Sequence, residues 1–314
     1  MGRGWSAWRM IKHPCKAQQK ILRAYHLHLR DVAGLAPKTC HDRQQRVCQF
    51  LTAIPIRRIG DLRNLSAAKL VNYLTVRSAD YQSSSLQSVA SSLRSFLRFA
   101  QQQGWSHRPL DLAVPKVACG PHNDLPVYLT PQQLQKLLTS WDRRTAEGKR
   151  DWAIGLCLAR LGLRASEAAT LRLEDCQWRQ GRLRLAQSKN GDAVELPLLR
   201  QVGEAIGGYL RLGRPACPLR QVFLLHHPPR PMDGKAISGV IQRALRDCAI
   251  QVPRAGAHLL RHTLASHLVQ QGASLKAVAD VLRHRDLNSA AVYAHVDIPS
   301  LRKLSQPWPQ ETAR

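Results

Sequence analysis

Four side chains able to bind or protonate a phosphate lie close together near the end of the chain. They are His258, Arg261, His284 and Tyr293, and two segments with helical periodicity separate them. Arginine clamps anionic oxygens, histidine exchanges protons near neutral pH, and tyrosine can act as a nucleophile. A lone histidine or tyrosine is more often solvated or packed in a core, so the joint spacing carries the prediction. Together the four side chains predict a catalytic site that could bind a phosphate.

Two predicted helices position these groups. In the first, leucines recur at every fourth position from residue 260 to 268, which leaves His258 and Arg261 off the apolar stripe and adjacent on one face. Gly272 is expected just after the end of this helix, and Ser274 is expected to cap the next one.

Length and charge point to two domains that face a polyanion. The chain has 314 residues, enough for two hydrophobic cores, and its 47 Lys and Arg exceed its 21 Asp and Glu by a formal charge of +26. The parts before and after residue 126 carry +13 each. A positive charge this high and this evenly divided predicts that both domains bind a polyanion, and it favours nucleic acid over a membrane as that partner.

No metal, cofactor or membrane segment is expected. The eight cysteines show no Cys-x-x-Cys spacing and predict reduced thiols, while the pair His258 and His262 lacks the glutamate of a zinc protease motif. No apolar run reaches the ~18 residues of a membrane span, and the N-terminus is too polar for a signal peptide. These features predict a soluble, intracellular protein of the cytoplasm.

The N-terminal half predicts a helical unit followed by a linker. Thr39 and Ser66 are expected to cap two of its helices. Four prolines and little periodicity predict an extended linker over residues 105–126. The segments before it are an arm over 1–16, helices over 17–30, 39–52 and 85–103, and a short helix after residue 66.

The second half opens with a helix signal at Thr130, which is followed by proline and then by the glutamine of a capping box. An apolar helix from about residue 150 ends at Gly162. Ser166 is expected to cap the next helix, which would set Arg164 beside free backbone N–H groups, a favourable place for a phosphate.

One β-hairpin is predicted within this mainly helical chain. Apolar residues alternate over 183–185 and 194–198, on either side of Asn190-Gly191, a dipeptide that favours a type I′ turn. Lys189 would stand at the tip, where a lysine is either solvated or swung toward a ligand. The fold class is therefore α+β, mainly helical with one small hairpin or sheet.

These motifs together resemble the tyrosine recombinases, the family of phage integrases and of the Xer and Cre recombinases. The order of the motifs and the nine-residue step from His284 to Tyr293 agree with the family pattern. The resemblance implies a helical core-binding domain over 17–104, a catalytic domain over 127–306 and a tail over 307–314. The motifs are Gly162-Leu163-Arg164-Ala165-Ser166-Glu167, Lys189, His258-Leu259-Leu260-Arg261-His262-Thr263, Leu282-Arg283-His284 and Tyr293-Ala294-His295-Val296.

The resemblance also implies a role for each polar residue. Tyr293 would attack a DNA phosphodiester and form a 3′-phosphotyrosyl link, with His258 as its base and Lys189 as the acid that protonates the leaving 5′-oxygen. Arg164 and Arg261 would clamp the non-bridging oxygens.

Two further residues would support this chemistry, and one departs from the family pattern. His284 would donate a hydrogen bond to the phosphorane, and Glu167 would orient neighbouring arginine or histidine groups. Arg283 stands where the family usually has glycine, which would either loosen the turn or add a phosphate contact.

The implied partner is double-stranded DNA, bound by a homotetramer on paired sites of a mobile element, with an accessory recombinase or directionality factor as a further partner. Two alternatives share the ancestry. One is an accessory DNA binder that no longer cleaves, which the complete set of catalytic residues disfavours. The other is an enzyme that relaxes supercoils or resolves hairpin telomeres, which the compact length disfavours.

Overall fold

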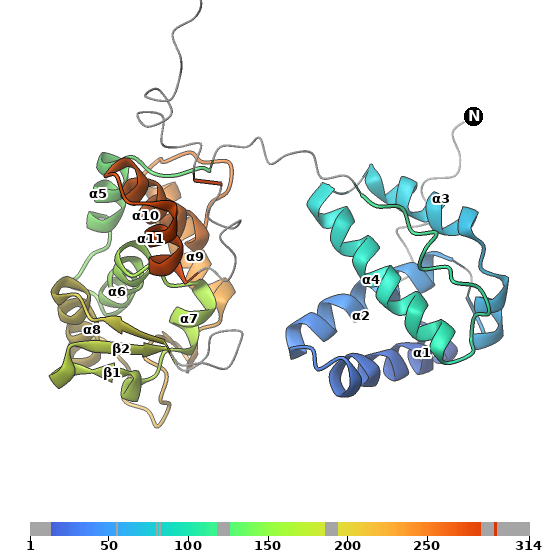
Figure 1. Ribbon diagram of the computed structural model, residues 1–314. Helices are drawn as coiled ribbons and strands as arrows, with labels where there is room; N and C mark the ends of the chain where they lie inside the picture. Colours follow the sequence, from blue (N-terminus) through green and yellow to red (C-terminus); the bar gives the residue numbers. More distant parts are fainter. Residues whose placement is uncertain are drawn as a thin grey trace, which may run out of the picture. The chain divides into compact units, whose positions relative to one another are not determined.

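The chain folds into two compact units, Met1–His122 and Asn123–Arg314, each with its own hydrophobic core (Figure 1). The expected fold class is confirmed, because helices dominate and the strands form small antiparallel sheets. None of the helices in the described ranges has the length and apolar character of a membrane span. The computed structural model describes residues 14–54, 56–79, 81, 83–117, 126–185, 194–283 and 292–293.

The described part of the N-terminal unit contains four α-helices, as predicted. Their apolar faces meet in a core whose largest side chains include Tyr25, Phe50 and Phe96, and the rings of Tyr25 and Phe96 meet edge to face with centroids 5.4 Å apart. The elements are α1 (Lys16–Leu27), a π-helical turn (His28–Val32), α2 (Pro37–Ala53), a 3-10 helix (Ile59–Asn64), α3 (Ala67–Ser78) and α4 (Ser83–Gln102).

The helix starts in this unit are partly as predicted. Ser66 caps α3, with its hydroxyl accepting a hydrogen bond from the backbone N–H of Lys69. Helix α2 begins earlier than the predicted cap at Thr39, because Ala36 is its N-cap and Pro37 its first residue. A proline fits this position since its fixed φ suits the first turn and its missing N–H has no helical partner there.

Part of the segment predicted as a linker belongs to the N-terminal core. Leu110 and Val114 are buried among the core side chains, and Asp111 accepts a hydrogen bond from Arg98 of α4 at 2.8 Å. Prolines break the periodicity of this segment, so no amphipathic pattern marked the two anchors. Residues 105–117 therefore cover the N-terminal unit, contrary to the expected extended linker.

Helix α6 is the centre of the C-terminal unit. Its residues from 153 to 159 are buried on all sides, because α5, α7, α8, α9 and α10 pack around it. The helices are α5 (Pro131–Thr139), α6 (Ala146–Arg160), α7 (Ala165–Thr170), α8 (Arg200–Leu212), α9 (Gly234–Asp247), α10 (Ala257–Gln270) and α11 (Leu275–Leu282).

Two small antiparallel sheets complete this unit, together with short 3-10 helices at Leu173–Asp175 and Trp178–Gln180. The first sheet has the strand order β1-β2-β3, and the second pairs β4 with β5. The strands are β1 (Cys176–Gln177), β2 (Arg182–Leu185), β3 (Val194–Pro197), β4 (Leu224–His226) and β5 (Pro229–Pro231).

The predicted hairpin strands are confirmed as β2 and β3, but their register differs from the prediction. Leu185 pairs with Val194, whereas a two-residue turn at Asn190-Gly191 would pair it with Leu196. A shift of two residues keeps the same side chains on the buried face, so apolar alternation could not distinguish the two registers. Residues 186–193, with the predicted Lys189, lie outside the described residues.

Candidate active site

Arg261, on α10, lies at the centre of the candidate site. Its side chain is fully buried, and its guanidinium donates hydrogen bonds to the backbone carbonyls of Gly162, between α6 and α7, and Leu282, at the end of α11. Burial and the nearby positive charge of Arg164 lower the pKa of Arg261 to about 10. The side chain remains charged at neutral pH, and it joins three segments that are far apart in the sequence.

Gly162 permits the close approach of these segments. Its φ is +58°, and an added Cβ would lie 2.9 Å from the side chain of Leu282 and 3.1 Å from that of Leu264. Glycine suits this position because it adopts the left-handed conformation without strain and leaves room for both leucines. The same residue supplies the carbonyl that holds Arg261.

Arg164 and Glu167 form a second part of the site at the start of α7. Arg164 is the N-cap, and the Glu167 carboxylate accepts hydrogen bonds from its backbone N–H at 2.8 Å and from its Nη1 at 2.6 Å. The prediction that Ser166 caps this helix is wrong. A capping box needs an acidic or amide side chain three residues after the cap, which Glu167 provides for Arg164.

The Glu167 carboxylate is held in its charged form. Burial raises its pKa, but the hydrogen bond from the backbone of Arg164 and the positive charges of Arg283 and Arg164 outweigh that effect and lower it overall. The carboxylate is thus an anionic link between two arginines, which fits the orienting role expected of it.

Arg283 ends α11 and points into the protein. Its φ of 55° and ψ of 47° are left-handed, so the turn keeps the conformation that glycine favours and is not loosened. Its side chain is 11% exposed and forms an ion pair with Glu167 at 2.9 Å. The structure therefore shows neither of the two expected consequences of an arginine here, a looser turn or a side chain turned out toward a phosphate.

Tyr293 lies buried against α10 and α11, in a small apolar cluster separate from the main core of the unit. Its hydroxyl oxygen is 2.7 Å from Nδ1 of His262. Burial raises the pKa of Tyr293 to about 12, although the charge of Arg261 opposes the shift. A hydroxyl with so high a pKa reacts near neutral pH only with a proton acceptor beside it, and His262 occupies that position.

His258 lies next to His262, with the two ring centroids 4.3 Å apart and the rings nearly perpendicular. The prediction named His258 as the base for the tyrosine, whereas the hydrogen bond observed is to His262. Partial desolvation and the charges of Arg261 and Arg164 lower the pKa of His258. Its imidazole is therefore neutral at neutral pH, when it can still accept a hydrogen bond.

The site carries more positive than negative charge. Arg164, Arg261 and Arg283 influence one another electrostatically, and among the described residues Glu167 is the carboxylate that acts on Arg261 and Arg283. An excess of partly buried guanidinium groups, of which Arg261 interacts electrostatically with Tyr293, favours binding of an anion such as a phosphodiester. Among the residues that the structure describes, no group of three or more His, Cys, Asp or Glu side chains is arranged to hold a metal ion.

Most of the predicted site residues come together in space. Lys189 and His284 lie outside the described residues, so their roles stay predictions. The residues brought together are Arg164, Glu167, His258, Arg261 and Tyr293.

Two residues of the site were missed at the level of the sequence. His262 is part of the motif from His258 to Thr263. Because it follows His258 by four residues, the helical period predicts both rings on one face of the helix. Arg283 was noticed only as a departure from the family. Its pairing with Glu167 joins residues 116 positions apart, and no local pattern signals such a contact.

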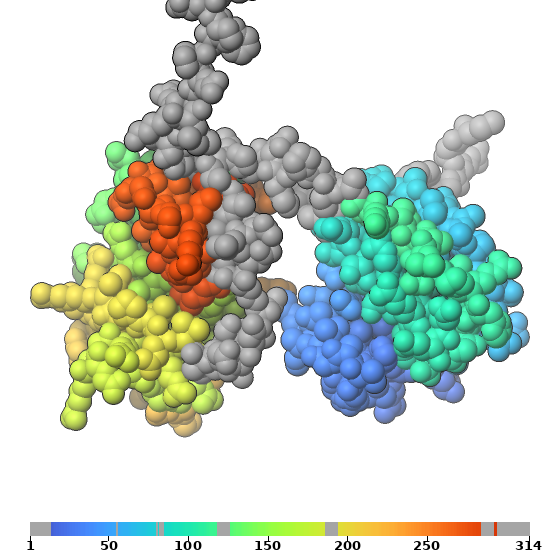
Figure 2. All heavy atoms as spheres, in the orientation of Figure 1, coloured from blue at the N-terminus to red at the C-terminus, as the bar shows by residue number. Residues whose placement is uncertain are grey.

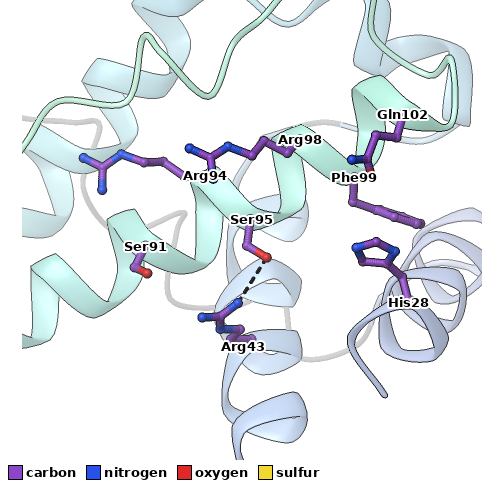
Figure 3. Close-up of a pocket in the computed structure, with 8 residues that line it drawn as sticks. All are labelled: His28, Arg43, Ser91, Arg94, Ser95, Arg98, Phe99 and Gln102. Atoms are coloured by element: carbon purple, nitrogen blue, oxygen red, sulfur yellow. Dashed lines mark hydrogen bonds between the residues drawn. The ribbon is translucent and has the colours of Figure 1, made fainter. Parts of the chain in front are cut away.

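A second basic site lies in a groove of the N-terminal unit between α2 and α4 (Figure 3). Arg94 and Arg98 extend from α4, which runs across the face of the unit shown in Figure 2. Arg43 of α2 donates a hydrogen bond to the Ser95 hydroxyl at 3.2 Å. Guanidinium and hydroxyl groups along one groove are typical of contacts to a nucleic-acid backbone.

Models of known protein families match both units. The model of the phage integrase N-terminal SAM-like domain matches residues 22–104, and that of the phage integrase family matches residues 127–298, more than half of the chain. The chain belongs to the phage integrase family. The resemblance seen in the sequence is thereby confirmed, and the chain is an enzyme of the tyrosine recombinase class.

Individual relatives agree with this membership of the phage integrase family. The chain is 38% identical over 307 residues to the putative integrase/recombinase y4rA of Sinorhizobium fredii, covering 96% of this chain and 74% of the relative. It is 28% identical over 276 residues to the tyrosine recombinase XerD of Listeria monocytogenes, covering 84% of this chain and 89% of XerD.

Solved structures show the same fold. The XerH site-specific recombinase bound to its palindromic difH substrate matches with a TM-score of 0.69 at 18% identity, covering 93% of this chain and 84% of XerH. A lambda integrase dimer bound to a COC′ core site matches with a TM-score of 0.67 at 17% identity, covering 94% of this chain and 99% of the integrase chain.

Proposed function

We propose that this enzyme cuts and rejoins DNA strands with Tyr293 as the nucleophile and His262 as the group that takes the tyrosine proton. The observation that carries the proposal is the 2.7 Å contact between the Tyr293 hydroxyl and Nδ1 of His262. His258 then supports the reaction from the neighbouring position, as a neutral hydrogen-bonding group beside the arginines.

The proposed step conserves the phosphodiester energy. The Tyr293 oxygen forms a bond to phosphorus, the bond from phosphorus to the 5′-oxygen breaks, and the tyrosine proton passes to His262. Lys189 supplies the proton that the 5′-oxygen needs. The 5′-hydroxyl of a partner strand then attacks the 3′-phosphotyrosyl link and releases Tyr293, so strand exchange needs no ATP.

The arginines stabilise the charge that builds on the non-bridging oxygens during attack. The side chain of Arg164 is 40% exposed, which leaves it room to contact the phosphate. The buried Arg261 stabilises the negative charge of the phosphate electrostatically. His284 adds a hydrogen-bond donor in the same proposal. Each preorganised donor of this kind typically contributes about 3–4 kcal/mol to the transition state.

The wider assembly in this proposal is a homotetramer on two paired sites in double-stranded DNA, at the ends of a mobile element. The catalytic domain over 127–306 carries out the chemistry. The domain over 17–104 binds the DNA backbone through the groove lined by Arg43, Arg94 and Arg98. An accessory recombinase or directionality factor would act on this complex.

A suicide-substrate assay tests the function. The protein is mixed with nicked DNA from the ends of its own element and run on a denaturing gel beside Tyr293→Phe. We expect a covalent protein–DNA band for the wild type and none for the variant. Tyr128→Phe is the matched control, since it removes a tyrosine hydroxyl that contacts Gln270 at 3.0 Å elsewhere in the same unit. DNA binding without any covalent band would instead support an accessory DNA binder.

A further inference from the structure

We propose that Arg283 is a positioning residue that holds Arg164 and Glu167 in the geometry used for phosphate binding. The inference deepens the proposed function and rests on it. Four observations carry it: the backbone conformation of Arg283, the partners of its side chain, the partner of its carbonyl, and its exposure compared with that of Arg164.

The backbone conformation does not favour an arginine. Residue 283 is in the left-handed region, where a Cβ approaches the following carbonyl oxygen and glycine is preferred. Ala249, after α9, has nearly the same φ, 53°, and is exposed. The turn alone therefore gives no reason for a long charged side chain at position 283, so the reason lies in its contacts.

The side chain of Arg283 crosses from the end of α11 to the loop before α7. Its Nη2 lies 2.9 Å from the Glu167 carboxylate and 3.2 Å from the Gly162 carbonyl, and its Nη1 lies 3.4 Å from the Leu161 carbonyl. Three acceptors on one neighbouring segment fix the planar guanidinium in position.

The backbone carbonyl of Arg283 completes a ring of contacts. It accepts a hydrogen bond from Nη2 of Arg164 at 3.2 Å, while Nη1 of Arg164 donates to Glu167 at 2.6 Å. Arg283 thus holds Arg164 directly through its carbonyl and indirectly through Glu167. Both terminal nitrogens of Arg164 have partners whose positions depend on residue 283.

Exposure separates this role from direct substrate contact. The side chain of Arg283 is 11% exposed and its donors face Glu167 and backbone carbonyls, whereas the side chain of Arg164 is 40% exposed. Arg164 is the group that reaches a phosphate, and Arg283 acts through it.

The first test measures covalent-complex formation in single turnovers at saturating DNA. Arg283→Gly suits the backbone and removes the side chain, and we expect the rate to fall about 10²-fold with DNA affinity changed less than about threefold. Arg283→Lys keeps the charge without the planar fork, and should recover about tenfold of the loss. A fall in affinity with an unchanged rate would show that Arg283 contacts DNA itself and would overturn the inference.

Two comparisons make this test specific. In an Arg164→Lys background, Arg283→Gly should lower the rate only about twofold further, because the effect passes through Arg164. The same ~10²-fold loss in both backgrounds would contradict the proposal. Ala249→Gly is the matched control for the backbone change, since it alters the same conformation away from the site and should leave the rate unchanged.

A second test does not depend on catalysis. In ¹⁵N NMR spectra of the full chain, a guanidinium held on two sides gives separate Nη signals because its rotation is slow. We expect such signals for Arg164, assigned through Arg164→Lys, and their merging in Arg283→Gly. Unchanged Arg164 signals in that variant would refute the positioning role. Failure of the wild type to form a covalent complex would refute the proposed function, with this measurement still deciding the role of Arg283.

Discussion

The two units both gather arginines, but they hold them in different ways. In the C-terminal unit, Arg261 is buried and the Arg283 side chain is 11% exposed, and both donate to backbone carbonyls or Glu167. In the N-terminal groove, the side chain of Arg98 is 64% exposed and pairs with Asp111. A buried charge is costly to desolvate, fixed in geometry and weakly screened by salt, whereas an exposed one is mobile and strongly screened. The first arrangement suits preorganised chemistry, and the second suits salt-dependent attraction.

Replacing the buried Arg261 should show the difference between the two units most clearly. Arg261→Ala removes the donor to the carbonyl of Leu282 and leaves Arg283 as the remaining side-chain donor to that of Gly162, and an unsatisfied buried acceptor costs about 1–3 kcal/mol. We expect no covalent complex, and a free energy of unfolding lower by about 2–5 kcal/mol in urea titrations. Arg98→Ala, the exposed counterpart, should cost at most about 1 kcal/mol. Equal losses in the two variants would contradict the comparison.

Within the C-terminal site, His262 and His258 should differ in their effect on the rate of covalent-complex formation. His262→Ala removes the partner of the Tyr293 hydroxyl, so we expect the single-turnover rate of covalent-complex formation to fall about 10²–10⁴-fold at saturating DNA. His258→Ala should have the smaller effect, since His258 does not form that hydrogen bond. A larger loss for His258→Ala would restore the role that the sequence suggested for it.

The contribution of the exposed groove should be visible in the salt dependence of DNA affinity. Arg43→Gln combined with Arg98→Gln removes two charges that we propose contact the DNA backbone, so the slope of log affinity against log salt should become shallower by about 2. The rate of covalent-complex formation at saturating DNA should not change. Filter-binding titrations across a salt series measure the slope. If the rate fell and the slope did not, the groove would belong to the chemistry.

The smallest effect concerns the titration of His258. Desolvation and the charges of Arg261 and Arg164 lower its pKa, so its NMR titration midpoint should lie below the usual value of about 6.5. The unfolded chain then binds the proton first as the pH falls, and the free energy of unfolding decreases as the pH drops through about 6.5. Arg164→Gln removes one of the charges, and should move the midpoint upward. An unchanged titration midpoint in Arg164→Gln would show that the charge of Arg164 does not lower the pKa of His258.

Local signals predicted much of the fold, although the caps expected at Thr39 and Ser166 were wrong. The caps at Ser66, Thr130 and Ser274 and the break at Gly162 were read correctly, because each depends on a few neighbouring residues. The start of α7 was missed because Ser166, two residues after Arg164, is of the residue type that more commonly caps a helix. The packing of residues 105–117 on the N-terminal core was missed too, since two apolar anchors in a turn-rich segment form no period.

The candidate site was predictable in its members more than in its contacts. Motif spacing identified Arg164, Arg261 and Tyr293, which the structure brings together. Which histidine meets the tyrosine depends on how the segment carrying Tyr293 packs against α10, and this packing has no sequence period. The contact between Arg283 and Glu167 is likewise a product of tertiary packing.

The small apolar cluster around Tyr293 lies apart from the main core around α6. It joins α10 and α11 through Ala265, Val269, Val278 and Leu282. The end of α11 also holds the arginines, because the Leu282 carbonyl accepts from Arg261 and the Arg283 side chain pairs with Glu167. The nucleophile and the phosphate-binding groups therefore depend on the position of one short helix, so a substitution that shifts α11 would disturb both together.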